Sequence, residues 1–122
     1  MRVLVVDGAN VVGSRPTGWW RDRAGAAERL HESIAQADLG YDLVVLVLEG
    51  AARAGWPAGD SDAVVTVHAR GSGDDAVVDE VRVRATAGDE VVVVTADREL
   101  RERVTVAGGS HVGPSWLLAR MA

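Results

Sequence analysis

The chain has 122 residues, of which 48% are hydrophobic, and 13 basic against 18 acidic residues give a formal net charge of −5. Because domains usually contain roughly 100–200 residues, we expect one domain over residues 1–122. The absence of cysteine excludes disulfide scaffolds, thiol nucleophiles and cysteine-ligated zinc. All the basic residues are arginine, which excludes a lysine Schiff base and the lysine of a phosphate-binding P-loop.

The first half of the chain is expected to begin with a strand over Arg2–Val6. Residues 11–20 have no clear period and are expected to form a loop. An apolar stripe predicts a helix from about Asp22 to Asp38, and a run of valine and leucine predicts a strand over Leu43–Leu48. Residues 49–62 are again expected to be a loop.

The second half continues the alternation of β-branched runs and helical patterns. Its expected elements are a strand over Val64–His68, a helix from about Ser72 to Gly88, a strand over Glu90–Thr95, a short helix after Asp97, a strand over Val104–Val106 and a last helical turn from Pro114. Short strands that alternate with helices are typical of an α/β fold with a parallel sheet. Most of these strands are nearly continuous valine and leucine, as expected for strands covered on both faces.

No apolar run approaches the roughly 20 residues needed to span a bilayer. The amino-terminal segment reaches Asp7 too soon to contain the apolar core of a signal peptide. We therefore expect a cytoplasmic protein without membrane contact. The negative charge, taken alone, argues against a general nucleic-acid coat, because such a protein needs a basic face.

Acidic residues follow the ends of four expected strands, at the edge where open α/β sheets bind ligands. They are Asp7, Glu49, Asp74 with Asp75, and Asp97. Clustered carboxylates repel one another, so a cation or bound protons must neutralise them. Oxygen ligands without cysteine suit Mg²⁺ or Mn²⁺, which can activate water and neutralise charge on a phosphoryl group. Together the five acids account for the whole net charge, which leaves the arginines free to meet phosphates.

Each acid also has a structural alternative. Ser72 with Asp75 fits a helix capping box, Asp97 fits an N-cap, and Asp7 before glycine fits a turn. Asn10 could likewise cap or turn. For Glu49 we prefer the start of a loop. These structural roles are independent of one another, whereas one metal site explains the other acidic positions together.

The histidines and tryptophans carry weaker signals. His31 is expected on the surface of its helix, and the spacing of the three histidines does not indicate a zinc site. Trp19 and Trp20, among several arginines, could stack bases, but we prefer a hydrophobic staple onto the following helix. Trp56 and Trp116 are expected to be packing residues.

Three segments, Val5–Val11, Gly73–Val78 and Val93–Asp97, resemble the signatures of PIN-like nucleases of the NYN (YacP-like) branch. The match spans nearly the whole chain, and the three segments stand in the same order. The resemblance implies a three-layer α/β PIN-like (NYN) fold with a central parallel sheet. If the expected strands are numbered 1 to 5 along the chain, the resemblance implies the order 3-2-1-4-5 across that sheet.

The resemblance also implies metal-dependent endoribonuclease activity with Mg²⁺ or Mn²⁺. The implied catalytic residues are Asp7, Asn10, Asp74, Asp75 and Asp97, the metal ligands being Asp7, Asp74 or Asp75, and Asp97. Asn10 would orient the first loop or a phosphate. Some members carry a fourth acid one helical turn after the last aspartate, where this chain has Arg101, so the number of metal ions stays open.

The mechanism we expect is in-line attack of an activated water on an RNA phosphodiester. The residues expected to contact RNA are Arg15, Arg98, Ser72 and Thr95, with Arg70 as a further phosphate ligand. Two alternatives stay open: an inactive NYN-like module that binds RNA or protein, and a nucleotide pyrophosphohydrolase. The sequence does not decide the oligomeric state, and a homodimer is one option.

Overall fold

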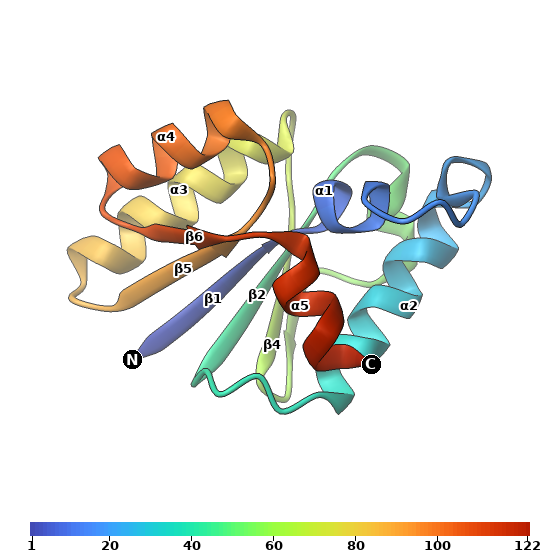
Figure 1. Ribbon diagram of the computed structural model, residues 1–122, viewed down its shortest axis with the longest axis horizontal. Coiled ribbons are helices and arrows are strands. Elements are labelled where there is room, and N and C mark those ends of the chain that lie inside the picture. Colours follow the sequence, from blue (N-terminus) through green and yellow to red (C-terminus); the bar gives the residue numbers. More distant parts are fainter.

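A six-stranded sheet runs through the centre of the protein in the computed structural model, which describes residues 1–122 (Figure 1). Its strands are β1 (Arg2–Asp7), β2 (Leu43–Leu48), β3 (Gly59–Ser61), β4 (Val64–His68), β5 (Glu90–Val94) and β6 (Ser110–Val112). Their order is β3-β4-β2-β1-β5-β6, with β3 antiparallel to β4 and every other pair parallel. The predicted α/β class is confirmed, as is the order of the four central strands, β4-β2-β1-β5.

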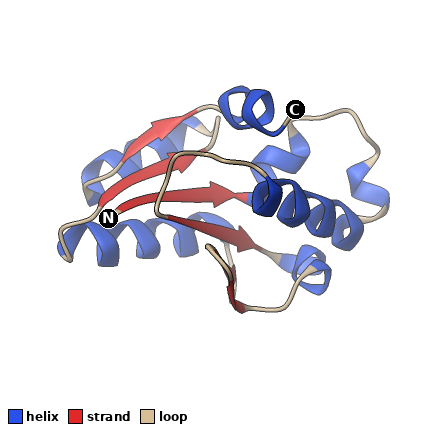
Figure 2. Ribbon diagram, turned by 90° about the horizontal axis from the view of Figure 1, so that it is seen from below, coloured by secondary structure: helices blue, strands red, loops and turns tan.

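Helices cover both faces of the sheet, which makes the fold three-layered (Figures 1 and 2). One layer contains α2 (Arg23–Gln36) and α5 (Pro114–Met121), and the other contains α3 (Gly73–Thr86) and α4 (Arg98–Ala107). Successive strand residues point to opposite faces, so the apolar side chains of β1, β2 and β5 divide between two cores. This explains why these strands read as continuous apolar runs. None of the helices is long and apolar enough to cross a membrane.

A short helix, α1 (Gly8–Gly13), begins where β1 ends, in a stretch whose later part was expected to be a loop. Its first residue, Gly8, is buried against β2, and a Cβ atom there would lie 2.6 Å from the carbonyl oxygen of Val47. Only glycine therefore lets the chain turn into the helix at this point. Two 3₁₀ turns also lie in the expected loops: η1 (Trp19–Arg21) at the end of the first loop and η2 (Gly50–Gly55) in the second.

The prediction of a strand over Val104–Val106 is wrong, because these residues lie in α4. Valine and threonine favour strands, but here Leu100 and Val104 bury the same helical face one turn apart, while Val106 is 90% exposed. The helix ends at Gly108, whose φ of 103° suits glycine. The strand at this edge of the sheet is β6 instead.

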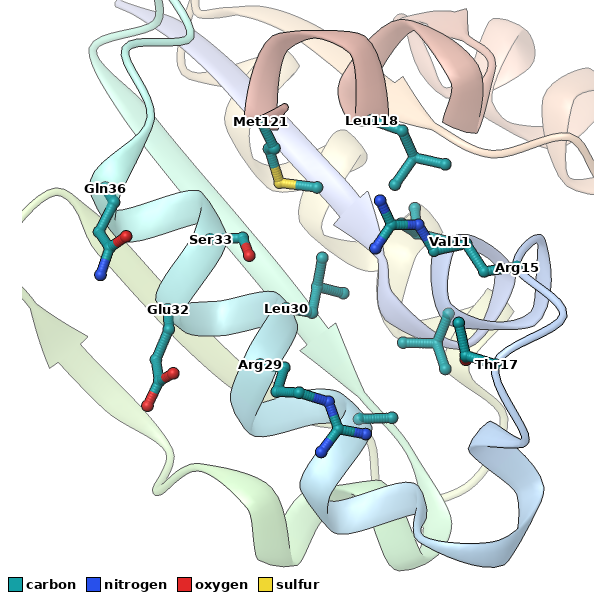
Figure 3. A pocket seen from close by; sticks show the side chains of 12 residues that line it. Val11, Arg15, Thr17, Arg29, Leu30, Glu32, Ser33, Gln36, Leu118 and Met121 are labelled. Carbon is teal, nitrogen blue, oxygen red and sulfur yellow. The ribbon is translucent and has the colours of Figure 1, made fainter.

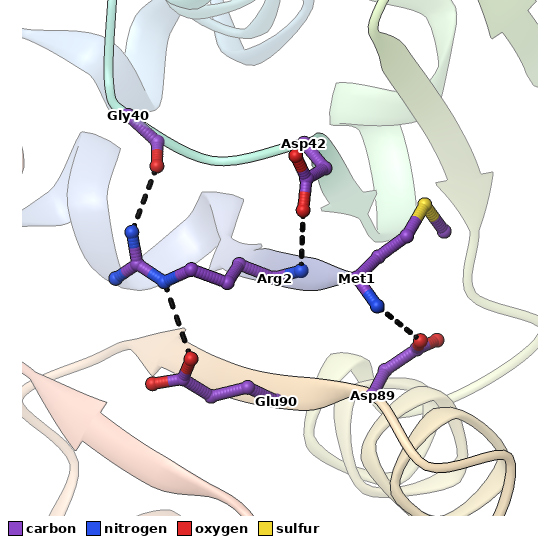
Figure 4. A network of polar contacts seen from close by, with 6 residues as sticks. All are labelled: Met1, Arg2, Gly40, Asp42, Asp89 and Glu90. Carbon is purple, nitrogen blue, oxygen red and sulfur yellow. Dashed lines mark hydrogen bonds and ion pairs between the residues drawn. The ribbon is translucent and has the colours of Figure 1, made fainter.

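Paired charges hold the amino-terminal end of the sheet together (Figure 4). The Arg2 backbone amide donates to Asp42, and the Arg2 side chain donates to Glu90 at 3.2 Å and to the Gly40 carbonyl at 2.9 Å. The Met1 amine pairs with Asp89 at 3.0 Å. These contacts join β1 to the residues that begin β2 and β5.

Candidate active site

Asp7 ends β1 at the opposite, carboxyl-terminal edge of the sheet, and its side chain is only 4% exposed. One carboxylate oxygen accepts a hydrogen bond from the Thr95 hydroxyl at 3.1 Å. Burial raises the pKa of Asp7 to about 6, against the opposing effect of the Thr95 hydrogen bond. The negative charges of Asp74 and Glu49 raise this pKa further.

Asp74 lies in the first turn of α3, which Ser72 caps by accepting from the Asp74 amide at 3.1 Å. The Asp74 side chain is half-buried. Its pKa is raised, first by burial and then by the charges of Asp97 and Glu49. Asp74 of α3 is therefore influenced by carboxylates from two other segments, Glu49 after β2 and Asp97 before α4.

Asp97 and the residues before it are fixed by a chain of hydrogen bonds. The Thr95 hydroxyl donates to Asp7 and accepts from the Asp97 amide at 3.2 Å, and the Asn10 side chain accepts from the Ala96 amide at 2.8 Å. Asp97 caps α4, as its structural alternative predicted, by accepting from the Leu100 amide at 2.8 Å. Thr95 is fully buried, so its side chain holds Asp7 and does not reach a substrate.

Glu49 belongs to this group, although the start of a loop was the preferred interpretation. It does precede η2, but its carboxylate accepts from the Gly73 amide at 3.0 Å and so reaches the start of α3. A Cβ atom at Gly73 would lie 2.8 Å from Oε1 of Glu49, so any other residue there would make this carboxylate shift. The sequence signal was its position, since Glu49 follows β2 as Asp7 ends β1.

Asp75 lies apart from these acids. Its carboxylate accepts from Arg103 of α4 at 2.8 Å and is largely exposed. Together with Asp79, Asp75 lines a surface cavity that none of the other acids named above lines. Of the two adjacent aspartates named as alternatives, the structure therefore brings Asp74, and not Asp75, toward Asp7.

The four acids, Asp7, Glu49, Asp74 and Asp97, which we call the edge acids, have no ion-pair partner. They do not form a ready-made metal centre either, because no three acidic or histidine side chains are close enough to hold an ion. Their chemistry nevertheless fits a hard cation, since every donor is an oxygen and each carboxylate offers about four acceptor sites.

The expected RNA-contacting arginines are exposed around this edge. Arg98 begins α4 next to Asp97, and Arg70 lies in the loop before α3. Arg15 follows α1 and lines a cavity of about 330 Å³ between α1, α2 and α5, which Arg29 also lines (Figure 3). None of these four arginines forms an ion pair, so their charges are available to a ligand.

Arg101 stands at the helical position where a fourth acid was expected from the resemblance. Its Nε atom donates to the Thr95 carbonyl at 2.8 Å, and its side chain is half-buried. This position therefore adds a positive charge to the segment that carries Thr95 and Asp97, and it provides no metal ligand.

No protein-family model matches the sequence, and no curated protein matches it. Two crystal structures of Rae1 (YacP) from Bacillus subtilis match the structure. A point-mutant form has a TM-score of 0.78 and 19% identity over 99% of this chain and 75% of that chain. The other has a TM-score of 0.72 and 19% identity over 99% and 74%. The resemblance found in the sequence is thus confirmed for the fold: this chain has the PIN-like fold of Rae1 (YacP).

Proposed function

We propose that this protein is a metal-dependent endoribonuclease that hydrolyses RNA phosphodiester bonds at the edge acids. The observation that carries the proposal is Asp7, a buried carboxylate without a cationic partner that lies near other acids. Leaving a buried charge uncompensated is costly, and perturbed acids of this kind gather at functional sites. The fold shared with Rae1 (YacP) supports the same conclusion.

Asp7, Asp74 and Asp97 would hold the ion, with Asp74 taken as the ligand rather than the alternative Asp75, and Glu49 would be a further carboxylate beside them. A bound Mg²⁺ or Mn²⁺ supplies a water of lowered pKa and neutralises charge on the attacked phosphate. Thr95 and Asn10 are positioning residues, because their hydrogen bonds fix Asp7 and the segment that leads to Asp97.

The arginines around the edge would bind RNA. Arg98 begins α4 beside Asp97, where its guanidinium can contact a phosphate next to the cleaved bond. The six residues of α1 span about 9 Å, so Arg15, which follows the far end of this helix, would contact a more distant phosphate. Binding through such contacts is expected to weaken as salt rises.

An assay on labelled RNA tests the proposal. Single-stranded and structured RNAs are incubated with the protein in Mn²⁺, Mg²⁺ or EDTA, beside Asp7→Asn and Asp97→Asn variants. We expect cleavage in Mn²⁺ or Mg²⁺, none in EDTA, and a large loss in both variants. Cleavage that persists in both variants would come from a contaminant and would contradict the proposal.

A second candidate is an RNA-binding module without chemistry. The lack of three converging acids and the presence of Arg101 in place of a fourth acid favour it. Retention of RNA without cleavage in any metal would support this candidate. Turnover of nucleoside triphosphates without RNA cleavage would instead indicate a pyrophosphohydrolase.

A further inference from the structure

We propose that another cavity, beside the edge acids, binds one nucleobase of single-stranded RNA against Trp19. This inference rests on the proposed function, because it assigns the place of a nucleotide next to the cleaved bond. The cavity measures about 270 Å³. The lining includes Gly8, Trp19, Arg23, Leu48 and Glu49.

The position of this cavity connects it to the candidate active site. Gly8 directly follows Asp7, and Glu49 is itself one of the edge acids. A nucleotide whose phosphate lies at Asp7 can therefore place its base in the cavity without leaving this edge of the sheet.

The chemistry of the lining favours a base over a phosphate. Much of the wall consists of small or branched apolar side chains, and the Trp19 ring supplies an aromatic surface. The Arg23 guanidinium lies 4.9 Å from the centroid of the Trp19 ring, which adds a cation beside that surface. Glu49 repels a phosphate, whereas its carboxylate can accept from a ring N–H or an exocyclic amine.

The size of the cavity also fits one nucleobase and not a whole nucleotide. Pockets for drug-sized ligands measure about 300–1,000 Å³, so a cavity of about 270 Å³ lies just below that range. The sugar and phosphate would then stay outside, where the arginines are exposed.

The other tryptophans differ in their surroundings. Trp56 stacks on the buried His31 with ring centroids 3.7 Å apart, and Trp116 packs edge-on against Tyr41. Trp20 meets Trp19 edge-on but is 54% exposed and does not line the cavity. Trp20 is therefore a matched control for Trp19, since both are adjacent members of η1.

Binding to RNA in EDTA at low ionic strength tests the inference without any cleavage. A short fluorescent single-stranded RNA is titrated with the protein, next to versions that lack the base at one position after another. We expect one position at which base removal weakens wild-type binding about 10-fold, the order of one base–aromatic stack. Trp19→Ala should weaken binding of the intact RNA by about the same factor. The affinity of this variant should no longer depend on whether the base at that position is present.

Two further variants separate a lost contact from a damaged fold. Trp20→Ala should bind like wild type, and Trp19→Phe, which keeps a ring, should retain most of the sensitivity to base removal. Unaltered affinity of Trp19→Ala, or equal sensitivity to base removal in Trp19→Ala and wild type, would overturn the inference even if the wild type cleaves RNA. Base-dependent binding through Trp19 without cleavage in any metal would uphold it and remove the nuclease proposal.

Discussion

The two ends of the sheet treat their acidic residues in opposite ways. At the amino-terminal end, Glu90 pairs with Arg2, Asp89 pairs with the Met1 amine, and Asp42 accepts from a backbone amide (Figure 4). At the carboxyl-terminal end, the edge acids have only hydroxyl and amide partners and no ion pair. Charge is thus mostly compensated at one end of the sheet and uncompensated at the other, which is the contrast that the proposed site requires.

The charged groups at the two ends contribute to the free energy of unfolding with opposite signs. Because the pKa of Asp7 is about 6 in the folded protein against 3.8 unfolded, ionising it at pH 7 costs about 3 kcal/mol of stability. An exposed pair such as that of Arg2 with Glu90 contributes less than about 1 kcal/mol of stabilisation. The carboxyl-terminal end therefore destabilises the fold, as expected of a site that a ligand completes.

The largest difference between the ends should appear in RNA cleavage. Asp7→Asn is expected to lower the rate about 10²–10³-fold, the loss typical of removing one electrostatic contact to a transition state. Glu90→Gln, at the other end, should leave the rate unchanged. Equal effects of the two substitutions in a cleavage assay would remove the distinction between the ends.

Metal should stabilise the protein through one end only. At a Mn²⁺ concentration 100 times its Kd, the free energy of unfolding should rise by about 2.7 kcal/mol. Chemical denaturation with and without Mn²⁺ measures this gain. Glu90→Gln should keep it and Asp7→Asn should lose most of it, so a full gain in Asp7→Asn would place the ion elsewhere.

The stability of the metal-free protein should depend on pH through Asp7. The folded state binds this proton more tightly than the unfolded chain, so wild-type stability should fall as pH rises from about 4 to about 6. In EDTA, Asp7→Asn should be more stable than wild type by about 2 kcal/mol at pH 7.5, with the difference vanishing near pH 4. Denaturation at both pH values provides the measurement; a variant that is less stable at pH 7.5 would show that the ionised carboxylate does not destabilise the fold.

The smallest effect on RNA cleavage should come from Asp75, which lies apart from the edge acids. Asp75→Asn loses the exposed pair with Arg103, and cleavage should change by less than about fivefold. Asp74→Asn should lose far more activity. A reversal of these two results, measured side by side, would show that α3 presents Asp75 to the ion.

Sequence patterning predicted the parts of the fold that depend on local burial. The continuous apolar runs of β1, β2 and β5 correctly indicated strands covered on both faces. It failed at Val104–Val106, where β-branched residues lie in a helix because Val104 packs one turn after Leu100. It also missed α1, whose six residues include two glycines and are too few for a clear period.

Side-chain direction was the part of the site that the sequence could not provide. Asp74 and Asp75 are neighbours in the chain, yet a helix turns about 100° between them and sends one toward the other acids and one toward Arg103. Glu49 reaches the site through a contact with Gly73, 24 residues away. His31, expected on the surface, is buried because η2 brings Trp56 onto α2.

The most direct test of the account is a crystal structure grown with Mn²⁺, in which the anomalous signal locates the ion independently of activity. We expect an anomalous peak between Asp7 and Asp74, with carboxylate oxygens of both acids as ligands and Asp97 turned toward the ion. Absence of a peak at Mn²⁺ concentrations that fully support cleavage, or a peak held only by acids at the amino-terminal end, would contradict it.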